Sequence, residues 1–271
     1  MPFLIIIYLL LFYPILKLHI PLSDAFWEDL SILVQSEALK SAFFLTIKCS
    51  LIALLLLLII VLATCDWLAK QIKREKAKVL KSILDGLVLF YMTLPPAVLG
   101  LMLLIAYGKQ SLGTFHLALS TTAVIMVAFL VGLPILYQIL MQSLGAIPIS
   151  YELLCHQMGL NQWQIFYRIH LPLIKRDLLR GIFLAWARML AEFGATLIFA
   201  GNLMGESKTL TLLIYEYIAL DIKQAQILAM MMCDGVLLVF LVFYLVDTLQ
   251  STSRSHNIKP KVSNPTFDKS L

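Results

Sequence analysis

Two ionisable residues lie four positions apart inside an apolar stretch of this chain. Arg188 and Glu192 fall within the stretch Gly181–Gly201, and a spacing of four places both side chains on one face of a helix. A charge inside a membrane-spanning helix is costly, so such residues usually face one another or a water-filled cavity. Two interpretations follow: Arg188 helps an anion along a pathway, or Arg188 and Glu192 form a structural ion pair. We favour the pair, because a tight anion site would slow release.

A pair of prolines and one threonine complete the candidate set within the apolar stretches. Pro95 and Pro96 leave backbone carbonyls without partners, which is tolerated where neighbouring groups or water satisfy them. They indicate either a kink beside a pathway or a simple packing deformation, and both interpretations stay open. Thr196 is the third candidate. His156 and His170 have no partners at metal-ligand spacing and are interpreted as solvated loop histidines.

The usual signatures of catalysis and metal binding do not occur in the sequence. It contains no G-x-x-x-x-G-K-[ST] loop for ATP phosphates, no H-E-x-x-H and no G-x-S-x-G. The four cysteines are far apart and form no C-x-x-C motif. We therefore expect no metal site, no cofactor bound by this chain and no ATP hydrolysis by this chain alone.

Composition defines the elements that must carry these residues. Of the 271 residues, 61% are hydrophobic and 14% are charged, whereas soluble proteins have about 45–50% and about 25%. Because a helix needs about 20 apolar residues to cross a bilayer, the sequence predicts an all-α integral membrane protein with six spans. The predicted spans are Phe3–Ile20, Ala42–Ala63, Ile83–Tyr107, Ala118–Gln142, Gly181–Gly201 and Ala225–Leu249. The first lacks a basic n-region and an A-x-A site, so we interpret it as an uncleaved helix.

Lysine and arginine set the orientation of these spans. Fourteen of the 21 basic residues fall between the second and third spans, in the loop after the fourth, or in the tail. By the positive-inside rule these segments are cytoplasmic, so both termini are predicted to be inside. The formal net charge of +5 then reflects topology and indicates no nucleic-acid partner.

The flanking segments complete the predicted domain organisation. Ser23–Ser41 has apolar residues on one helical face and predicts an external interfacial helix, with Trp27 at headgroup level. The polar tail carries Pro260 and Pro265 and predicts disorder. We therefore divide the chain into an N-terminal helix with its external segment (1–37), a membrane domain (38–249) and a disordered cytoplasmic tail (250–271).

The cytoplasmic loop from Gln142 to Arg180 is too long and too patterned for a plain connection. Pro148 and Ser150 predict the start of a short helix, Gly159 its stop and Asn161 a second start. The sequence therefore predicts two short helices joined at a glycine.

This loop resembles the signature loop of binding-protein-dependent ABC importer permeases. Gly159 and Leu171-Pro172 keep the family's spacing, with the proline thirteen residues after the glycine, and Trp163 stands where the family has an aromatic residue. The family signature also has an acidic residue followed by two small residues, typically alanines. This chain departs from that part of the signature, because the equivalent residues are Glu152 or Leu153, then Leu154 and Cys155. The resemblance implies the type I permease fold, with this loop forming a coupling helix that seats in an ATPase subunit.

Two further runs resemble the molybdate/tungstate branch of that family. They are Trp186–Asn202, which contains Phe193-Gly194-Ala195-Thr196, and Gly205–Thr209; Leu94–Gly100 resembles the branch's double-proline helix. The sulfate branch shares the arginine, acidic residue and glycine but differs after them. Sulfate or thiosulfate therefore stays an alternative cargo, and an intramembrane enzyme using Arg188 and Glu192 is a distant one.

The resemblance also implies partners and a location. It implies a permease homodimer, an ABC ATPase that uses ATP and Mg²⁺, and a periplasmic or extracellular oxyanion-binding protein. The chain would lie in a bacterial or archaeal plasma (inner) membrane, in contact with lipid. Selection of the cargo would then fall mainly to the binding protein.

Overall fold

A computed structural model describes residues 2–21, 25–73, 77–108 and 117–257, and these residues are overwhelmingly helical. The chain divides into two compact units, residues 1–232 and 233–271. The helices of the first unit are α1 (Pro2–Leu18), α2 (Phe26–Gln35), α3 (Glu37–Lys73), α4 (Lys78–Thr93), α5 (Pro96–Tyr107), α6 (Thr121–Gly145), α7 (Ile149–Gln157), α8 (Gln162–Ile165), the π-helix η1 (Phe166–His170), α9 (Leu171–Leu190), α10 (Gly194–Phe199) and α11 (Leu210–Leu220). Helix α12 (Ile222–Asn257) begins in this unit, and its part from Cys233 on belongs to the second.

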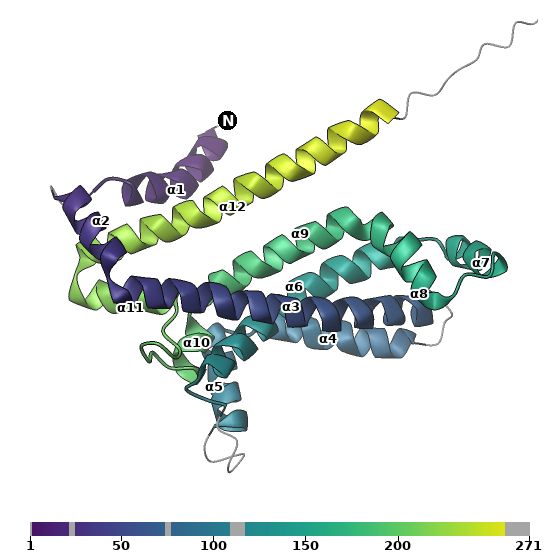
Figure 1. The fold of residues 1–271 in the computed structure, drawn as a ribbon, viewed down its shortest axis with the longest axis horizontal. Coiled ribbons are helices and arrows are strands. Elements are labelled where there is room, and N and C mark those ends of the chain that lie inside the picture. Colours follow the sequence, from purple (N-terminus) through teal and green to yellow (C-terminus); the bar gives the residue numbers. More distant parts are fainter. Residues whose placement is uncertain (1, 22–24, 74–76, 109–116, 258–271) are drawn as a thin grey trace, which may run out of the picture. The chain divides into compact units, whose positions relative to one another are not determined.

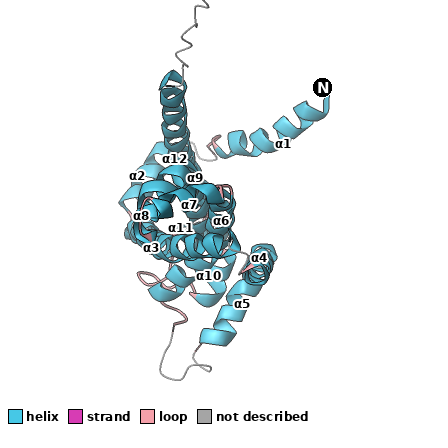
Figure 2. Cartoon of the chain, turned by 90° about the vertical axis from the view of Figure 1, so that its right-hand side faces the viewer, coloured by secondary structure: helices cyan, strands magenta, loops and turns pink. Residues whose placement is uncertain are grey.

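Helices α3, α6 and α9 pack together and form the main core of the first unit (Figures 1 and 2). Leu57, Leu136, Leu140 and Ala185 are fully buried between them. The opposite face of α3 is also apolar but exposed, for example at Leu55. A helix that is apolar on every side belongs inside a membrane, where close packing of helices holds a bundle together.

The predicted third span is interrupted at its two prolines. Helices α4 and α5 meet at an angle of 111°, and the residues between them, Leu94 and Pro95, have extended backbone. A proline disfavours helical backbone in the residue before it, while Pro96 fits the first turn of α5. The prolines therefore end one helix and begin another, which is a larger change than the predicted kink.

The predicted count of six spans is not confirmed. In the described part of the chain, three helices are long and apolar enough to cross a membrane: Glu37–Ile72, Thr121–Gly145 and Ile222–Leu245. The bent α4–α5 pair makes a fourth if it counts as one span. The predicted fifth span, Gly181–Gly201, is not one helix, because α9 ends at Leu190 and α10 starts at Gly194. Helix α1 contains 17 residues and includes Pro14.

The described parts of the segments that flank the predicted membrane domain contain helices. Helix α2 lies within the predicted interfacial segment, with Trp27 79% exposed and Leu33 buried beside Ala42, Leu213 and Ile227. At the other end, α12 continues to Asn257, so the predicted disordered tail begins inside a helix. No proline or glycine interrupts the sequence between Leu249 and Asn257, which removes the usual stop signals. The rest of the tail, 258–271, lies outside the described residues.

Candidate coupling loop and intramembrane ion pair

Helix α7 is the first short helix of the loop, and it ends at Gln157, two residues before Gly159. This glycine has φ +75°, a left-handed conformation that glycine adopts readily. The Leu160 N–H donates to the Cys155 carbonyl over 3.0 Å, which closes the helix end as in a Schellman motif. Local sequence therefore determines the turn.

The second short helix, α8, starts with a capping box. The Asn161 side chain accepts from the Gln164 N–H, and the Gln164 side chain accepts from the Asn161 N–H, each over 2.9 Å. This pairing satisfies two N–H groups that the first helical turn leaves free. The chain then continues through η1 into α9. The prediction of two short helices joined at a glycine is confirmed.

The structure divides the predicted coupling residues between the surface and the interior. Leu154 and Trp163 are 58% and 71% exposed, whereas Glu152 and Cys155 are buried. Leu171 is half-buried and Pro172 exposed in the first turn of α9. Only the exposed members can contact a partner in this conformation, so the buried ones are placed to hold the loop.

Large apolar side chains are exposed along the loop. Between Ile149 and His170, the large apolar residues that are at least half exposed are Tyr151, Leu153, Leu154, Met158, Trp163 and Tyr167, and we call them the exposed loop residues. The rings of Trp163 and Tyr167 stack with centroids 6.2 Å apart. A cluster of exposed apolar side chains is typical of a protein–protein contact.

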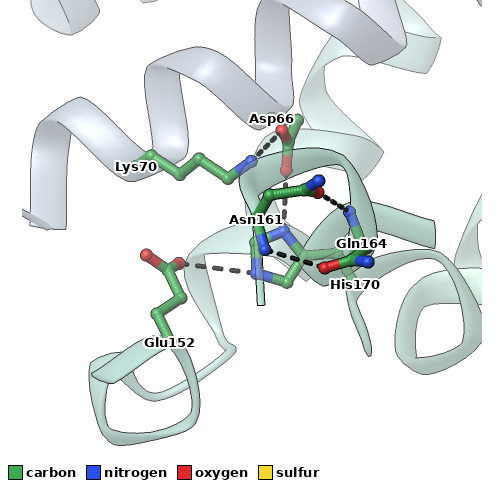
Figure 3. A network of polar contacts seen from close by, with 6 residues as sticks. All are labelled: Asp66, Lys70, Glu152, Asn161, Gln164 and His170. Atoms are coloured by element: carbon green, nitrogen blue, oxygen red, sulfur yellow. Dashed lines mark hydrogen bonds and ion pairs between the residues drawn. The ribbon is translucent and has the colours of Figure 1, made fainter. Parts of the chain in front are cut away.

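A polar cluster joins the loop to α3 (Figure 3). His170 is 1% exposed, so its interpretation as a solvated histidine is wrong. Its Nδ1 is 2.7 Å from Asp66 Oδ1, and its Nε2 is 3.5 Å from Glu152 Oε1. Asp66 Oδ2 accepts from Lys70 Nζ. Sequence reasoning missed the cluster because Asp66 is 104 residues away in the chain; the only sequence signal was an acidic residue, Asp66, at the end of an apolar stretch.

A groove of about 910 Å³ opens beside the cluster. It is lined by α3, α8, η1 and α9, mostly with apolar residues such as Leu58, Leu62 and Ile182. Asp66, Lys70 and Trp163 also line it. Part of α3 therefore faces the α8–η1 segment across this groove.

Arg188 and Glu192 contact one another at the end of α9. The Arg188 Nη1 lies 3.0 Å from Glu192 Oε2, and the two side chains are 40% and 2% exposed. Glu192 does not lie on a continuing helix, as the sequence predicted, but just after α9 ends. Its buried carboxylate has an arginine partner, as buried charges require.

Glu192 also organises the break between α9 and α10. Its Oε1 accepts from the Ala195 N–H over 3.0 Å, and its carbonyl accepts from Thr211 Oγ1 over 2.9 Å. A carboxylate at a helix N-terminus satisfies free N–H groups and interacts favourably with the helix dipole. The residue therefore ties the start of α10 to both α9 and α11.

The double proline and Thr196 lie close to this break. A Cβ added to Gly194 would be 3.1 Å from Pro96 Cβ, so the start of α10 rests on the start of α5. Thr196 is buried and lines a cavity of about 20 Å³ together with Glu192, Thr46 and Thr209. A cavity of that size has room for about one water molecule, and no oxyanion fits it in this conformation.

Comparison with known proteins assigns this architecture to a family. Residues 67–254 match the family described as the binding-protein-dependent transport system inner membrane component, and the chain belongs to that family. It is therefore a multi-pass membrane protein.

Among its relatives, the probable transport system permease protein NifC of Clostridium pasteurianum is 37% identical over 65% of this chain. The molybdenum transport system permease protein ModB of Haemophilus influenzae is 32% identical over 51%. The Mycobacterium bovis protein of the same name is 30% identical over 70% of this chain and 72% of its own length. The matches to the first two span 63% and 64% of those proteins.

Two solved structures share the fold. The MetNI methionine ABC transporter, in an inward-facing form, covers 79% of this chain and 99% of its own, with a TM-score of 0.64 and 15% identity. A bacterial ABC transporter involved in import of the polysaccharide alginate covers 92% and 93%, with a TM-score of 0.70 and 14% identity. The chain therefore has the type I ABC importer permease fold.

Proposed function

We propose that this chain is the permease subunit of an ATP-driven importer and that its cargo is an oxyanion, molybdate or tungstate. Two copies would line the pathway, a separate ABC ATPase would hydrolyse ATP, and an external binding protein would deliver the oxyanion. Closure of the ATPase dimer would bring the two cytoplasmic loops together and tilt the helices attached to them.

The observation that carries the coupling role is the set of exposed loop residues. Tyr151, Leu154 and Trp163 are each at least half exposed although they are large and mostly apolar. They lie on short helices whose turns are fixed by Gly159 and by the Asn161 capping box. A defined apolar surface of this kind suits docking into a groove of an ATPase subunit.

The molybdate assignment is supported by relatives and by the two sequence runs that resemble the molybdate/tungstate branch. Relatives named as molybdenum permeases are 30–33% identical over 51–70% of this chain. Sulfate permease 2 of Chlamydomonas reinhardtii is 34% identical, but over 45% of this chain and 35% of its own length. Sulfate therefore remains the second candidate, and a cargo test must separate the two.

The coupling role can be tested with a matched pair of substitutions. Leu154→Asp places a charge among the exposed loop residues, whereas Val79→Asp does so at a more exposed apolar residue on α4. We expect Leu154→Asp to reduce co-purification with the cognate ATPase about tenfold or more, as truncating a hot spot does. Val79→Asp should leave it near the wild-type level. Full co-purification of the Leu154→Asp variant would contradict the docking role of this loop.

A further inference from the structure

His170 connects the cytoplasmic loop with α3. It is the last residue of η1 and immediately precedes α9, and its side chain is 1% exposed. One ring nitrogen faces Asp66 on α3 and the other faces Glu152 on α7 (Figure 3). The imidazole therefore lies between the first short helix of the loop and a long transmembrane helix.

The charges around the ring favour its protonated form. Asp66 and Glu152 contribute two negative charges and Lys70 contributes one positive charge, so an imidazolium makes the cluster neutral. Burial lowers the pKa of His170, but the hydrogen bond to Asp66 and the nearby Glu152 carboxylate outweigh it, and the pKa lies above its usual 6.5.

The two contacts differ in their need for the proton. A neutral imidazole has one N–H and one lone pair. The contact of 2.7 Å between Nδ1 and Asp66 keeps the N–H on Nδ1, because a carboxylate only accepts. The Nε2 lone pair then faces the Glu152 carboxylate over 3.5 Å, which is repulsive. Deprotonation therefore breaks the contact with α7 and preserves the contact with α3.

We propose that protonated His170 is a positioning residue that ties α7 to α3 through Glu152 and Asp66, and that loss of its proton releases α7. Resting on the function proposed above, this tie would pass the movement of an ATPase-bound α7 to the transmembrane bundle. The groove between α3 and the α8–η1 segment lies directly beside this contact, and Asp66 and Lys70 line it.

The pH dependence has a defined sign. A group whose pKa is raised on folding contributes its contact below that pKa and loses it as the pH rises through it. The contact that joins α7 to α3 is therefore complete at mildly acidic pH, and it is lost as the pH rises through the raised pKa of His170. His170 is the member of the cluster whose ordinary pKa lies near neutral pH.

The assay uses the full transporter, with its ATPase and binding protein, in proteoliposomes. The quantity measured is molybdate imported per ATP hydrolysed, from about pH 6 to about pH 9, a range that brackets histidine titration. For the wild type we expect the ratio to fall about fivefold at the alkaline end, the lower range of coupling between sites. His170→Gln should show the low ratio at every pH. His19→Gln, which alters an exposed histidine, should behave as the wild type.

Glu152→Gln separates a tie from a general structural role. The glutamine amide can accept from an imidazolium or donate to the Nε2 lone pair, so the contact with His170 persists in both protonation states. The molybdate imported per ATP hydrolysed should therefore stay high and lose its pH dependence. An alkaline fall in Glu152→Gln equal to the wild type's would overturn the proposal, and so would a His170→Gln variant with the wild-type profile.

A second readout does not depend on transport. Hydrogen exchange of α7 amides in the permease alone, referenced to α6 amides at the same pH, should increase at alkaline pH in the wild type but not in Glu152→Gln. Unchanged relative exchange in the wild type would overturn the tie. Absence of any ATP-dependent import by the wild type would instead overturn the proposed function, while the exchange result still decides the role of His170.

Discussion

At the scale of single residues, the Arg188–Glu192 pair has unequal partners. The Glu192 side chain is 2% exposed and the Arg188 side chain is 40% exposed. Each single substitution therefore leaves an unpaired charge in a different environment. Arg188→Met leaves a buried carboxylate with the Ala195 N–H as its remaining close donor. Glu192→Gln leaves a guanidinium that water can still reach.

We expect Arg188→Met to be the more damaging substitution. Breaking a buried pair costs about 3–5 kcal/mol, and that range applies to the buried Glu192 rather than to the partly hydrated Arg188. The double variant Arg188→Met with Glu192→Gln should retain more folded protein than Arg188→Met alone. The measurement is the monodisperse fraction after heating in detergent. If the double variant loses as much monodisperse protein as the two single variants lose together, the pair does not stabilise the fold. A role for Arg188 in the pathway then becomes the better account.

Gly159 gives a second prediction at this scale. A Cβ added there would meet nothing within 4 Å, so substitution acts through the positive φ alone. Gly159→Val should cost roughly 1–2 kcal/mol of backbone strain and lower oxyanion-stimulated ATP hydrolysis, with normal membrane insertion. Gly159→Asn should be milder, because asparagine tolerates this conformation.

Gly145→Val is the matched control for this substitution. Gly145 also has open space around an added Cβ, and no positive φ. Equal stimulation in Gly159→Val and Gly145→Val would show that the turn at Gly159 is not needed for coupling.

Single residues were predictable where local sequence determines them. The turn at Gly159 and the cap at Asn161 depend on neighbours within a few positions, so their residue types were sufficient evidence. The burial of His170 depends on Asp66, 104 residues away, and Glu192 has a further partner, Thr211, on another helix. Such contacts require the fold, which one sequence does not supply.

At the scale of elements, α5 and α10 approach unusually closely. A Cβ added to Gly100 would lie 2.8 Å from both Cα and O of Ala195. Because both are backbone atoms, no side-chain rotation can remove this overlap. Gly100→Ala should therefore separate the two helices and disturb Glu192, whose Oε1 accepts from the Ala195 N–H. We expect a lower thermal midpoint and a lower folded yield in detergent.

Gly86→Ala on α4 is the control for that prediction. An added Cβ at Gly86 meets nothing within 4 Å, and alanine favours a helix by roughly 0.5–1 kcal/mol over glycine. This variant should be neutral or slightly more stable. A Gly100→Ala protein as stable as Gly86→Ala would show that α5 and α10 do not depend on this contact.

The long apolar helices were predictable and their interruptions were not. Ala42–Ala63 falls inside α3, and Ala118–Gln142 largely coincides with α6, because hydrophobicity alone identifies a helix of membrane length. The break after Leu190 carries no proline. It depends on the Glu192 contacts with Arg188, Ala195 and Thr211, which hydrophobicity does not report.

At the scale of the whole molecule, the fold and the family define an importer permease, and three similar ions are its candidate cargos. Molybdate, tungstate and sulfate are all tetrahedral dianions, and each would be bound by hydroxyl, amide and helix N-terminal donors. The buried hydroxyls around Glu192 surround a cavity of only about 20 Å³, so this cavity does not rank the three. Cargo must therefore be established by following the ion.

The most direct measurement compares a strain lacking this chain with the same strain carrying it again. The account predicts that the deleted strain loses molybdenum-enzyme activity at trace molybdate, recovers it at high molybdate, and still grows with sulfate as the sulfur source. Restoring the chain should restore activity at trace molybdate. Sulfur auxotrophy with intact molybdenum enzymes would contradict the assignment and make sulfate the cargo.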